Sequence, residues 1–547
     1  MRSPVHFLFA ASALVLSLTS GCGQPASAPV APPGLPVDAG PPVDGDWLVS
    51  RMGAEMENLN PYTSSDAYAS AILGLVFDTL LQRDNETLEL EPHLADSFEF
   101  SDDHLAYTFH LREGVTFSDG QPLTAADVKF SFDTLKNPEV DAPHLRNYYQ
   151  DVTDCEVVDD YTVRFTCSKP YFRHLLMLGG FEILPKHIYG EGDFNTHPNN
   201  RNPVGSGPYA FEQWDTGQQI ILTRNERYWN EEKKPRIVRR VYKLIVDNNA
   251  AFQVLLRQGI DLMDLLPEQW VNRGASGSFL TKFNRYSYYR PYYNYIGWNS
   301  QRPMFKDKRV RRAMTMLLDR ESIRENIYYG LAKTISGNFF IDSPEYNADV
   351  LPWPFDREAA KALLEEAGWV DADKDGVREK DGERFSFELL ITNAHPVAEQ
   401  VGTLFQEELK HAGVDMSIRP LEWASFLQSV DARRFDAVML GWSMPPDADP
   451  YQVWHSTQVE KGSNYVGFNN AEADRLIEEA RTTFDKDKRV QLYHRFHEII
   501  HEEQPYTFMF CSKVLLAVDK RFQNVTMYPL GPDTLEWWIP TALQRYH

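Results

Sequence analysis

Two histidines near the C-terminus have the spacing of a zinc site. His497 and His501 flank Glu498 in a His-Glu-x-x-His pattern, which on a helix places two imidazoles on one face to hold zinc. No third histidine follows at the spacing of the larger zinc-peptidase signature, and Pro505 is expected to end the helix. We therefore rank a zinc peptidase built on these residues below a chance match on an ordinary amphipathic helix.

An acidic stretch matches the first half of a calcium-binding loop. Loop positions 1, 3, 5 and 7, which supply three carboxylates and one backbone carbonyl, are Asp371, Asp373, Asp375 and Val377. The bidentate glutamate of position 12 is replaced by Gly382, and Glu383 comes one residue later. The pattern predicts a structural calcium site, and a solvated acidic turn is the alternative.

A third group of candidate residues follows an apolar strand. The strand ends at Gly441, and a proline-rich loop then carries Trp442, Asp447 and Asp449. Loops beyond strand ends in α/β layers commonly hold ligand sites, so we expect a binding site here. The alternatives are that both aspartates cap a turn and that Trp442 belongs to the core.

Two cysteines stand on one predicted β-hairpin. The turn falls near Asp159 and Asp160, so Cys155 and Cys167 lie on facing strands. An oxidising compartment would allow a disulfide between them, and two buried free thiols are the equal alternative. Cys511 is expected to be a plain core residue.

The N-terminus has the pattern of an export signal. Arg2 precedes an apolar run from about Phe7 to Leu18, which is shorter than the roughly 20 residues that a membrane span needs. Small residues before Cys22 resemble the lipobox of bacterial lipoproteins, although Thr19 stands where leucine is usual. We expect a signal peptide over 1–21, lipidation at Cys22, and a Pro/Ala/Gly-rich flexible tether through residue 45.

The length and net charge of the rest of the chain indicate how many domains it has and which function classes are disfavoured. Roughly 500 residues are too many for one hydrophobic core, so two or three domains are expected. The formal net charge of -23 repels phosphate backbones and argues against nucleic-acid binding. The basic run from Lys306 to Arg312 is predicted to be the solvated face of a helix.

Local signals predict a mixed α/β architecture. The predicted strands are Thr108–Leu111, Ile220–Thr223, Val241–Val246 and Phe385–Ile391. The predicted helices are Ala125–Leu135, Asp307–Leu318, Arg357–Ala367, Val397–Ala412, Ala471–Thr482 and Lys488–Glu502. Asp356 is a typical N-cap for the third helix, and Gly368 and Gly413 each follow a helix end. Strands and helices that alternate in the second half favour α/β layers.

Four ordered phrases carry a resemblance to a known family. They are Tyr107-Thr-Phe-His-Leu-Arg-Glu-Gly-Val-Thr-Phe117 with the following Asp119–Phe132, Val204-Gly-Ser-Gly-Pro-Tyr209 with Arg224–Trp229, Lys306–Ala313 with Asp319–Ile323, and Ala359–Trp369. Together they resemble the family 5 extracytoplasmic solute-binding proteins of bacterial ABC importers, of the dipeptide- and oligopeptide-binding type. The resemblance covers nearly all of the chain after residue 45.

The resemblance implies an α/β fold like that of the type II periplasmic binding proteins, with a ligand cleft between hinged lobes. Lobe I would combine 46–80, 206–288 and 516–547, lobe II would be the insert 81–205, and lobe III would be the α/β ligand lobe 289–515. In dipeptide-binding relatives an aspartate of the matching loop pairs with the peptide's α-ammonium, a role open to Asp447 or Asp449. Tyr62, Ser65 and Asp66 are expected to line the cleft.

The function implied is solute capture rather than catalysis. The chain is expected to be a monomer, lipid-anchored outside the cytoplasm of a bacterium, that delivers peptides to ABC permease subunits in the membrane. A metal chelate, a saccharide or another small solute is the alternative ligand within the same fold. No cofactor is expected beyond the calcium site.

Overall fold

The computed structural model describes residues 40–393, 395–460 and 462–546, which belong to one compact unit, Asp38–His547. The predicted signal peptide, Cys22 and the tether as far as residue 39 lie outside the described residues. Across the described part of the chain, we find no helix with both the length and the hydrophobicity that a membrane span requires.

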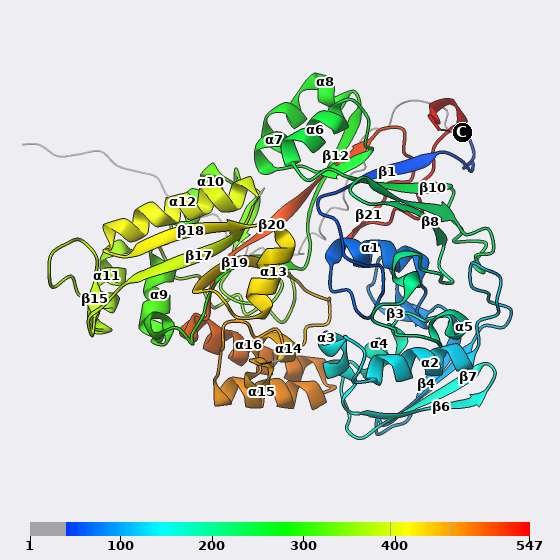
Figure 1. The fold of residues 1–547 in the computed structure, drawn as a ribbon, viewed down its shortest axis with the longest axis horizontal. Coiled ribbons are helices and arrows are strands. Elements are labelled where there is room, and N and C mark those ends of the chain that lie inside the picture. Colours follow the sequence, from blue (N-terminus) through cyan, green and yellow to red (C-terminus); the bar gives the residue numbers. More distant parts are fainter. Residues whose placement is uncertain (1–39, 394, 461, 547) are drawn as a thin grey trace, which may run out of the picture. The chain divides into compact units, whose positions relative to one another are not determined.

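A twelve-stranded sheet runs through most of the unit (Figure 1). Ten of its strands lie in the order β18 (Asp415–Leu421), β17 (Ser386–Thr392), β19 (Ala437–Ser443), β13 (Tyr292–Trp298), β20 (Tyr506–Asp519), β11 (Leu262–Asp264), β1 (Trp47–Met52), β10 (Arg239–Leu244), β9 (Gln219–Arg224) and β8 (Tyr209–Asp215). The other two, β12 (Phe283–Tyr289) and β14 (Ala332–Thr334), pair with β20.

Strand β20 joins the two halves of this sheet. Its Tyr506–Phe510 part pairs with β13, and its Lys513–Asp519 part pairs with β12. Most of its fourteen residues are buried, which explains its nearly continuous apolar sequence. Because β12 and β13 are consecutive, the chain passes between the two halves at residues 290–291 and again within β20.

Residues 81–205 form a separate four-stranded antiparallel sheet. Its order is β4 (Ala95–Phe100), β5 (Ala106–Leu111), β7 (Thr162–Cys167) and β6 (Val152–Asp159). Three small hairpins complete the strands: β2 (Leu81–Arg83) with β3 (Leu90–Pro92), β15 (Glu379–Lys380) with β16 (Glu383–Arg384), and β21 (Met527–Tyr528) with β22 (Gly531–Pro532).

Helices surround both sheets. They are α1 (Ala67–Val76), α2 (Ala125–Lys136), α3 (Pro143–Arg146), α4 (His174–Gly179), α5 (Lys186–Tyr189), α6 (Asn248–Leu256), α7 (Pro267–Val271), α8 (Gly277–Leu280), α9 (Lys308–Met316), α10 (Arg320–Asn326), α11 (Arg357–Glu366), α12 (Pro396–His411), α13 (Trp423–Asp431), α14 (Tyr451–Trp454), α15 (Ala471–Thr482) and α16 (Lys486–Glu503). Short 3₁₀ turns occur at Asn147–Tyr149, Pro198–Arg201, Arg273–Ala275, Pro303–Phe305, Ser456–Gln458 and Thr541–Leu543.

The predicted helices and strands are confirmed to within a few residues, and so are the helix ends. The Asp356 carboxylate accepts a hydrogen bond from the Ala359 N–H at the start of α11. Gly368 and Gly413 have φ values of +90° and +75°, which favour glycine after a helix end. One expectation for α9 is wrong: Arg311 is buried and not solvated, because its guanidinium donates to the carbonyls of Phe305 and Glu503.

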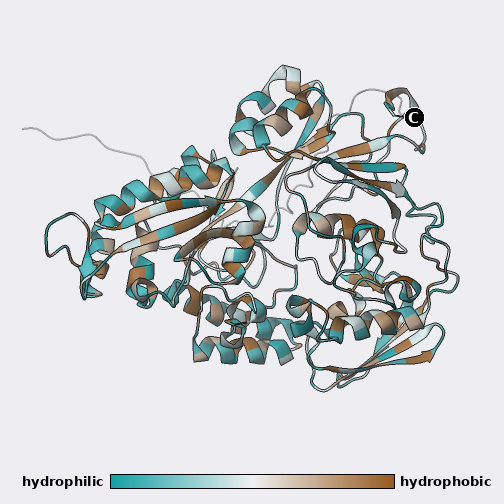
Figure 2. Ribbon diagram, viewed as in Figure 1, coloured by the Kyte–Doolittle hydropathy of each residue, from teal (hydrophilic) through white to brown (hydrophobic). Residues whose placement is uncertain are grey.

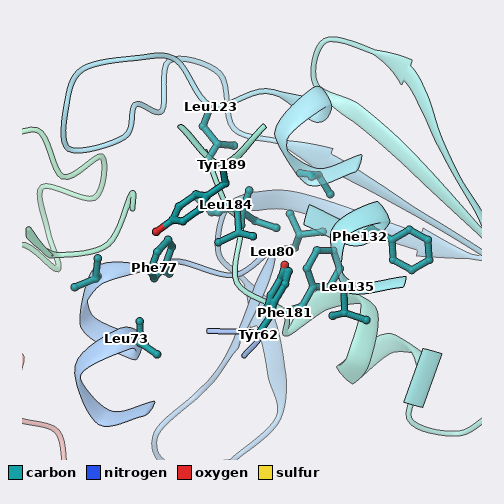
Figure 3. Close-up of a cluster of buried hydrophobic side chains, with 14 of the residues drawn as sticks. Tyr62, Leu73, Phe77, Leu80, Leu123, Phe132, Leu135, Phe181, Leu184 and Tyr189 are labelled. Atoms are coloured by element: carbon teal, nitrogen blue, oxygen red, sulfur yellow. The ribbon is translucent and has the colours of Figure 1, made fainter. Parts of the chain in front are cut away.

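Hydrophobic packing ties distant segments together. One core cluster combines α1 and the residues before it with the 81–205 segment, and Figure 3 shows Tyr62 beside Leu80 and Phe181 there. In Figure 2 hydrophobic and hydrophilic residues alternate along several strands of the main sheet, whereas α12 is largely hydrophilic on the side shown. Alternation of this kind is what places the sheet inside and the helices against solvent.

A buried ion-pair cluster joins three parts of the sequence. Arg521 follows β20, and its guanidinium pairs with the carboxylates of Asp46 and Asp261. All three side chains are at least 98 % buried. The start of β1, the start of β11 and the end of β20 are therefore fixed to one another.

Candidate functional site

Trp442 lies near the end of β19, which runs to Ser443, two residues beyond the predicted end at Gly441, and it pairs with Tyr293 of β13. Trp442 Nε1 lies 3.3 Å from the Tyr506 hydroxyl, to which it donates, and the indole stacks on the Tyr465 ring at 6.0 Å between centroids. The residue is half-buried, at the base of the loop. Its place fits a wall beside the loop better than a core position.

Asp447 reaches a residue far away in the sequence. Its carboxylate forms an ion pair with the Arg83 guanidinium at the end of β2. The Asp447 side chain is 46 % exposed, and that of Arg83 is 21 % exposed. Arg83 is fixed from its other side, because Nη1 donates to the Leu88 carbonyl at 2.6 Å. Asp447 is therefore a half-exposed charged group with one ion-pair partner among the described residues, and the Arg173 guanidinium adds a weaker electrostatic interaction.

Asp449 has a different environment from Asp447. Its side chain is fully buried and accepts hydrogen bonds from the Tyr171 hydroxyl and the Tyr451 N–H. Arg481 Nε of α15 lies 3.3 Å from the same carboxylate. A carboxylate bound in this way is a structural link rather than a free binding group.

More contacts of the same kind surround Asp449. Hydrogen bonds join Tyr148 to Gln452 at 2.5 Å, Asn147 to Gln458 at 2.9 Å, and the Phe172 N–H to the Arg481 carbonyl at 3.0 Å. The Arg481 guanidinium lies over the Tyr171 and Tyr451 rings at 4.3 and 4.2 Å. We call residues 147–173 and 449–481, joined by these contacts, the clasp. Figure 1 shows α3, which precedes the first segment, close to α14, which belongs to the second.

Burial and charge shift the pKa values in the clasp. Burial lowers the pKa of Arg481 and of Arg173, but Asp449 and Tyr171 more than offset this, so both pKa values are raised. Burial raises the pKa of Tyr148 to about 12. The arginines therefore stay charged and the tyrosines stay neutral at physiological pH, as their hydrogen bonds require.

Arg83 also lines a cavity of about 1160 Å³. The cavity lies between the β2–β3 hairpin, the 228–236 segment and the C-terminal 523–538 segment. Seven carboxylates line it against four basic side chains: Asp78, Asp84, Glu86, Glu91, Glu232, Asp533 and Glu536 against Arg83, Lys233, Lys234 and Arg236. Trp442, Asp447 and Asp449 are not among its lining residues, so Arg83 is the link between the cavity and the loop.

The three residues predicted to line the cleft near α1 have other roles. Tyr62 has no exposed surface, and its hydroxyl donates to the Glu182 carbonyl at 2.7 Å, so it belongs to the core. Asp66 caps α1 by accepting the N–H groups of Tyr68 and Ala69. Ser65 is exposed. The loop and these residues are thus not brought together as one site.

The hairpin cysteines are free thiols in this structure. Cys155 stands opposite Phe165, and Cys167 stands opposite Val152, so the pairing register separates the two sulfurs. Burial raises the pKa of each thiol to about 12. The structure therefore corrects the disulfide in favour of two buried thiols. Cys511 is also buried, in agreement with its predicted core role.

The acidic turn brings its three aspartates together. Oxygens of Asp371, Asp373 and Asp375 lie within 4.8 Å of one another, and all three residues are exposed. Asp375 pairs with the Arg384 guanidinium of β16. The Val377 N–H donates to the Asp375 carboxylate at 3.0 Å, as in a tight acidic turn, and no hydrogen bond or ion pair joins Glu383 to these carboxylates among the described residues. The calcium site stays a prediction, in which an ion would compete with Arg384.

The two histidines of the zinc pattern are occupied by the protein. His497 Nδ1 accepts the Asn347 N–H, and Nε2 lies 3.0 Å from the Ser336 hydroxyl. A Cβ atom at Gly337 would lie 2.2 Å from His497 Nε2, so no space is left there for a metal ion. His501 stacks on Trp353, and Glu498 pairs with Arg495. This geometry does not favour the zinc-peptidase interpretation.

Three residues of this region could not be predicted from the sequence: Arg83, Tyr171 and Arg481. Arg83 lies 364 positions from Asp447, and Tyr171 lies 278 positions from Asp449. Arg481 is closer to its partner, but in sequence it is one of several charges on an amphipathic helix. Short-range periodicity carries no signal for pairs of this kind.

Comparisons with known proteins agree on one family. Residues 89–464 match the model for "Bacterial extracellular solute-binding proteins, family 5 Middle". The oligopeptide-binding protein AppA of Bacillus subtilis is 32 % identical over 522 residues, which are 92 % of this chain and 93 % of that protein. Most of the relatives found are named as binding proteins, including the dipeptide-binding protein of Escherichia coli, which is 27 % identical over 90 % of this chain and 94 % of that protein.

Solved structures show the same fold. The AppA structure from Bacillus subtilis, in complex with a nonapeptide, has a TM-score of 0.86 and 31 % identity over 91 % of this chain and all of its own. NikZ from Campylobacter jejuni, in complex with Ni(L-His), has a TM-score of 0.81 and 27 % identity over 91 % of this chain and all of its own. The mixed α/β fold is that of the type II periplasmic binding proteins, as predicted, and the chain belongs to the family 5 solute-binding proteins of bacterial ABC importers.

Proposed function

We propose that the chain captures peptides outside the cytoplasm and delivers them to an ABC permease. The observation that carries this proposal is Asp447, a half-exposed carboxylate with one ion-pair partner, on the loop after β19. A peptide's α-ammonium is the cation that such a carboxylate binds well. The relation to AppA, which is named an oligopeptide-binding protein, supports the same ligand class.

The two loop aspartates have different roles in this proposal. Asp447 binds ligand, and Asp449 holds the loop to the 147–173 segment through Tyr171 and Arg481. The chain passes between the halves of the main sheet at residues 290–291 and within β20, so these points act as the hinge. Closure about the hinge buries the bound peptide, and no covalent bond of the peptide is changed.

The membrane attachment is proposed from the N-terminus alone. Lipidation at Cys22 would anchor the chain to the membrane, and the tether would hold the folded unit beside the permease. The protein would act as a monomer. A Cys22→Ser variant is expected to be released from the membrane fraction, whereas the wild type incorporates labelled palmitate and stays attached.

Calorimetric titration of the purified protein with di- to pentapeptides tests the ligand class. We expect micromolar or tighter binding and a change in Trp442 fluorescence on closure. Acetylation of the peptide N-terminus is expected to abolish most of the binding, because it removes the charge that pairs with Asp447. If no peptide gives heat or fluorescence change while a metal chelate or a saccharide does, the peptide assignment is wrong.

A further inference from the structure

Arg83 lines the cavity and also contacts the candidate ligand loop, through its ion pair with Asp447. We propose that Arg83 binds a carboxylate of the ligand, so that the site selects peptides with a carboxylate close to the N-terminal ammonium. This inference rests on the proposed function, in which Asp447 binds the ammonium. It adds a second charged contact, supplied by residues 81–205 rather than by the α/β segment.

The first step of the argument is charge balance. Arg83 and Asp447 neutralise each other across the two segments. An ammonium that binds Asp447 takes over this counter-ion, and a guanidinium that is only 21 % exposed is then left without one. An unpaired charge with so little exposed surface is unfavourable, so the ligand binds best when it brings an anion of its own.

Other carboxylates near Arg83 do not serve as replacements. Asp84 already accepts the N–H groups of Glu86 and Thr87. Glu91 is bound by Gln82 at 2.7 Å and by Lys233 at 3.3 Å. Glu86 is exposed to solvent. A ligand carboxylate is therefore the natural new partner for Arg83.

Arg83 itself can keep its position in this exchange, while the Asp447 carboxylate moves away from Nη2. Nη1 is held by the Leu88 carbonyl of the β2–β3 turn, and Nη2 is the atom that meets Asp447. The Nη2 side of a guanidinium binds any carboxylate, and two parallel hydrogen bonds form when the carboxylate lies in its plane. The ligand's carboxylate can thus take the place of Asp447 on an arginine that is already positioned.

Two matched probes test the inference by calorimetry: Ala-Glu-Ala-amide and Ala-Gln-Ala-amide, which differ only in the charge of the second side chain. We expect the wild type to bind the Glu probe roughly 10- to 100-fold more tightly, the range of a charge-assisted hydrogen bond. Arg83→Gln is expected to bind both probes equally. Arg83→Lys keeps the charge but not the planar fork, and it should keep part of the preference.

Arg164→Gln is the matched control, because Arg164 lies in the same segment but at the surface, 3.9 Å from Glu156. It should behave as the wild type, and circular dichroism should show all variants folded. Equal binding of the two probes by the wild type, or an equal change for both probes in Arg83→Gln and Arg83→Lys, overturns the inference. Both outcomes leave the proposed function standing, whereas failure of the wild type to bind any di- to pentapeptide overturns the proposed function and the inference together.

Discussion

At the scale of single residues, the loop after β19 contains two carboxylates with opposite surroundings. Asp447 is 46 % exposed and has one ion-pair partner, whereas Asp449 has no exposed surface and bonds to Tyr171, Tyr451 and Arg481. Because both residues are aspartates, the sequence alone does not distinguish their roles. Only their burial and partners assign recognition to one and structure to the other.

Replacing each aspartate by asparagine separates these roles. Asp447→Asn is expected to weaken peptide binding roughly 10- to 100-fold and to cost less stability than the change at Asp449, because Asp447 is half-exposed although Arg83 loses its counter-ion. Asp449→Asn is expected to lower the free energy of unfolding by roughly 2–4 kcal/mol, because it leaves the buried Arg481 without its counter-ion. Titration and urea unfolding of both variants measure the two effects. The reverse pattern would mean that Asp449 is the recognition group.

Glu182 makes stability depend on pH. Burial raises its pKa from 4.5 to about 7, so the folded protein holds this proton more tightly than the unfolded chain. Stability from this group is therefore full below pH 4.5 and is lost as the pH rises to 7. Glu182→Gln should stabilise the protein by roughly 1–3 kcal/mol at pH 8 and leave it unchanged at pH 4. Thermal melts at both pH values measure this, and an equal effect at both would contradict the buried charge.

At the scale of elements, the sequence predicts helices well and pairing registers poorly. Helix α11 follows from local signals, the Asp356 cap and Gly368, which act within a few residues. The hairpin of β6 and β7 was also recognised, but its pairing has irregularities after Val152 and after Val157. Bulges of this kind shift which residues face each other, and so the sequence could not decide between a disulfide and two thiols.

The acidic turn before β15 is a second element that the sequence recognised. If it binds calcium, the ion must displace Arg384 from Asp375, since the guanidinium now neutralises that carboxylate. Saturating calcium is then expected to stabilise the wild type by about 1–3 kcal/mol, with no effect in Asp373→Asn. Arg384→Gln should bind calcium more tightly than the wild type.

Calorimetric unfolding with calcium or with a chelator decides this question, and magnesium at the same concentration is the control. Equal melting temperatures in calcium and in chelator would show a solvated turn, the alternative that the pattern also allowed. The missing glutamate at position 12, replaced by Gly382, already weakens the site relative to a full calcium loop.

At the scale of the whole molecule, the family phrases predicted the fold because they are local and occur in order along the chain. They did not predict the clasp, in which residues 147–173 meet residues 449–481. Its hydrogen bonds join residues that are 278 to 311 positions apart, and each residue type is common on protein surfaces. The core position of Tyr62 could not be predicted for the same reason, since burial depends on packing partners.

The clasp joins residues 147–173 to residues 449–481 by hydrogen bonds that a hinge opening would have to break, so it should resist opening. Arg481→Gln removes the charge that Asp449 binds and the contacts over Tyr171 and Tyr451. We expect faster hydrogen exchange at 147–149 and 451–458 and faster release of bound peptide, while the main sheet stays protected. Arg475→Gln on the same helix, which loses only the exposed pair with Glu479, is the matched control. If the two variants exchange alike, the segments are held by packing rather than by the buried carboxylate, because removal of its counter-ion would then have no local effect.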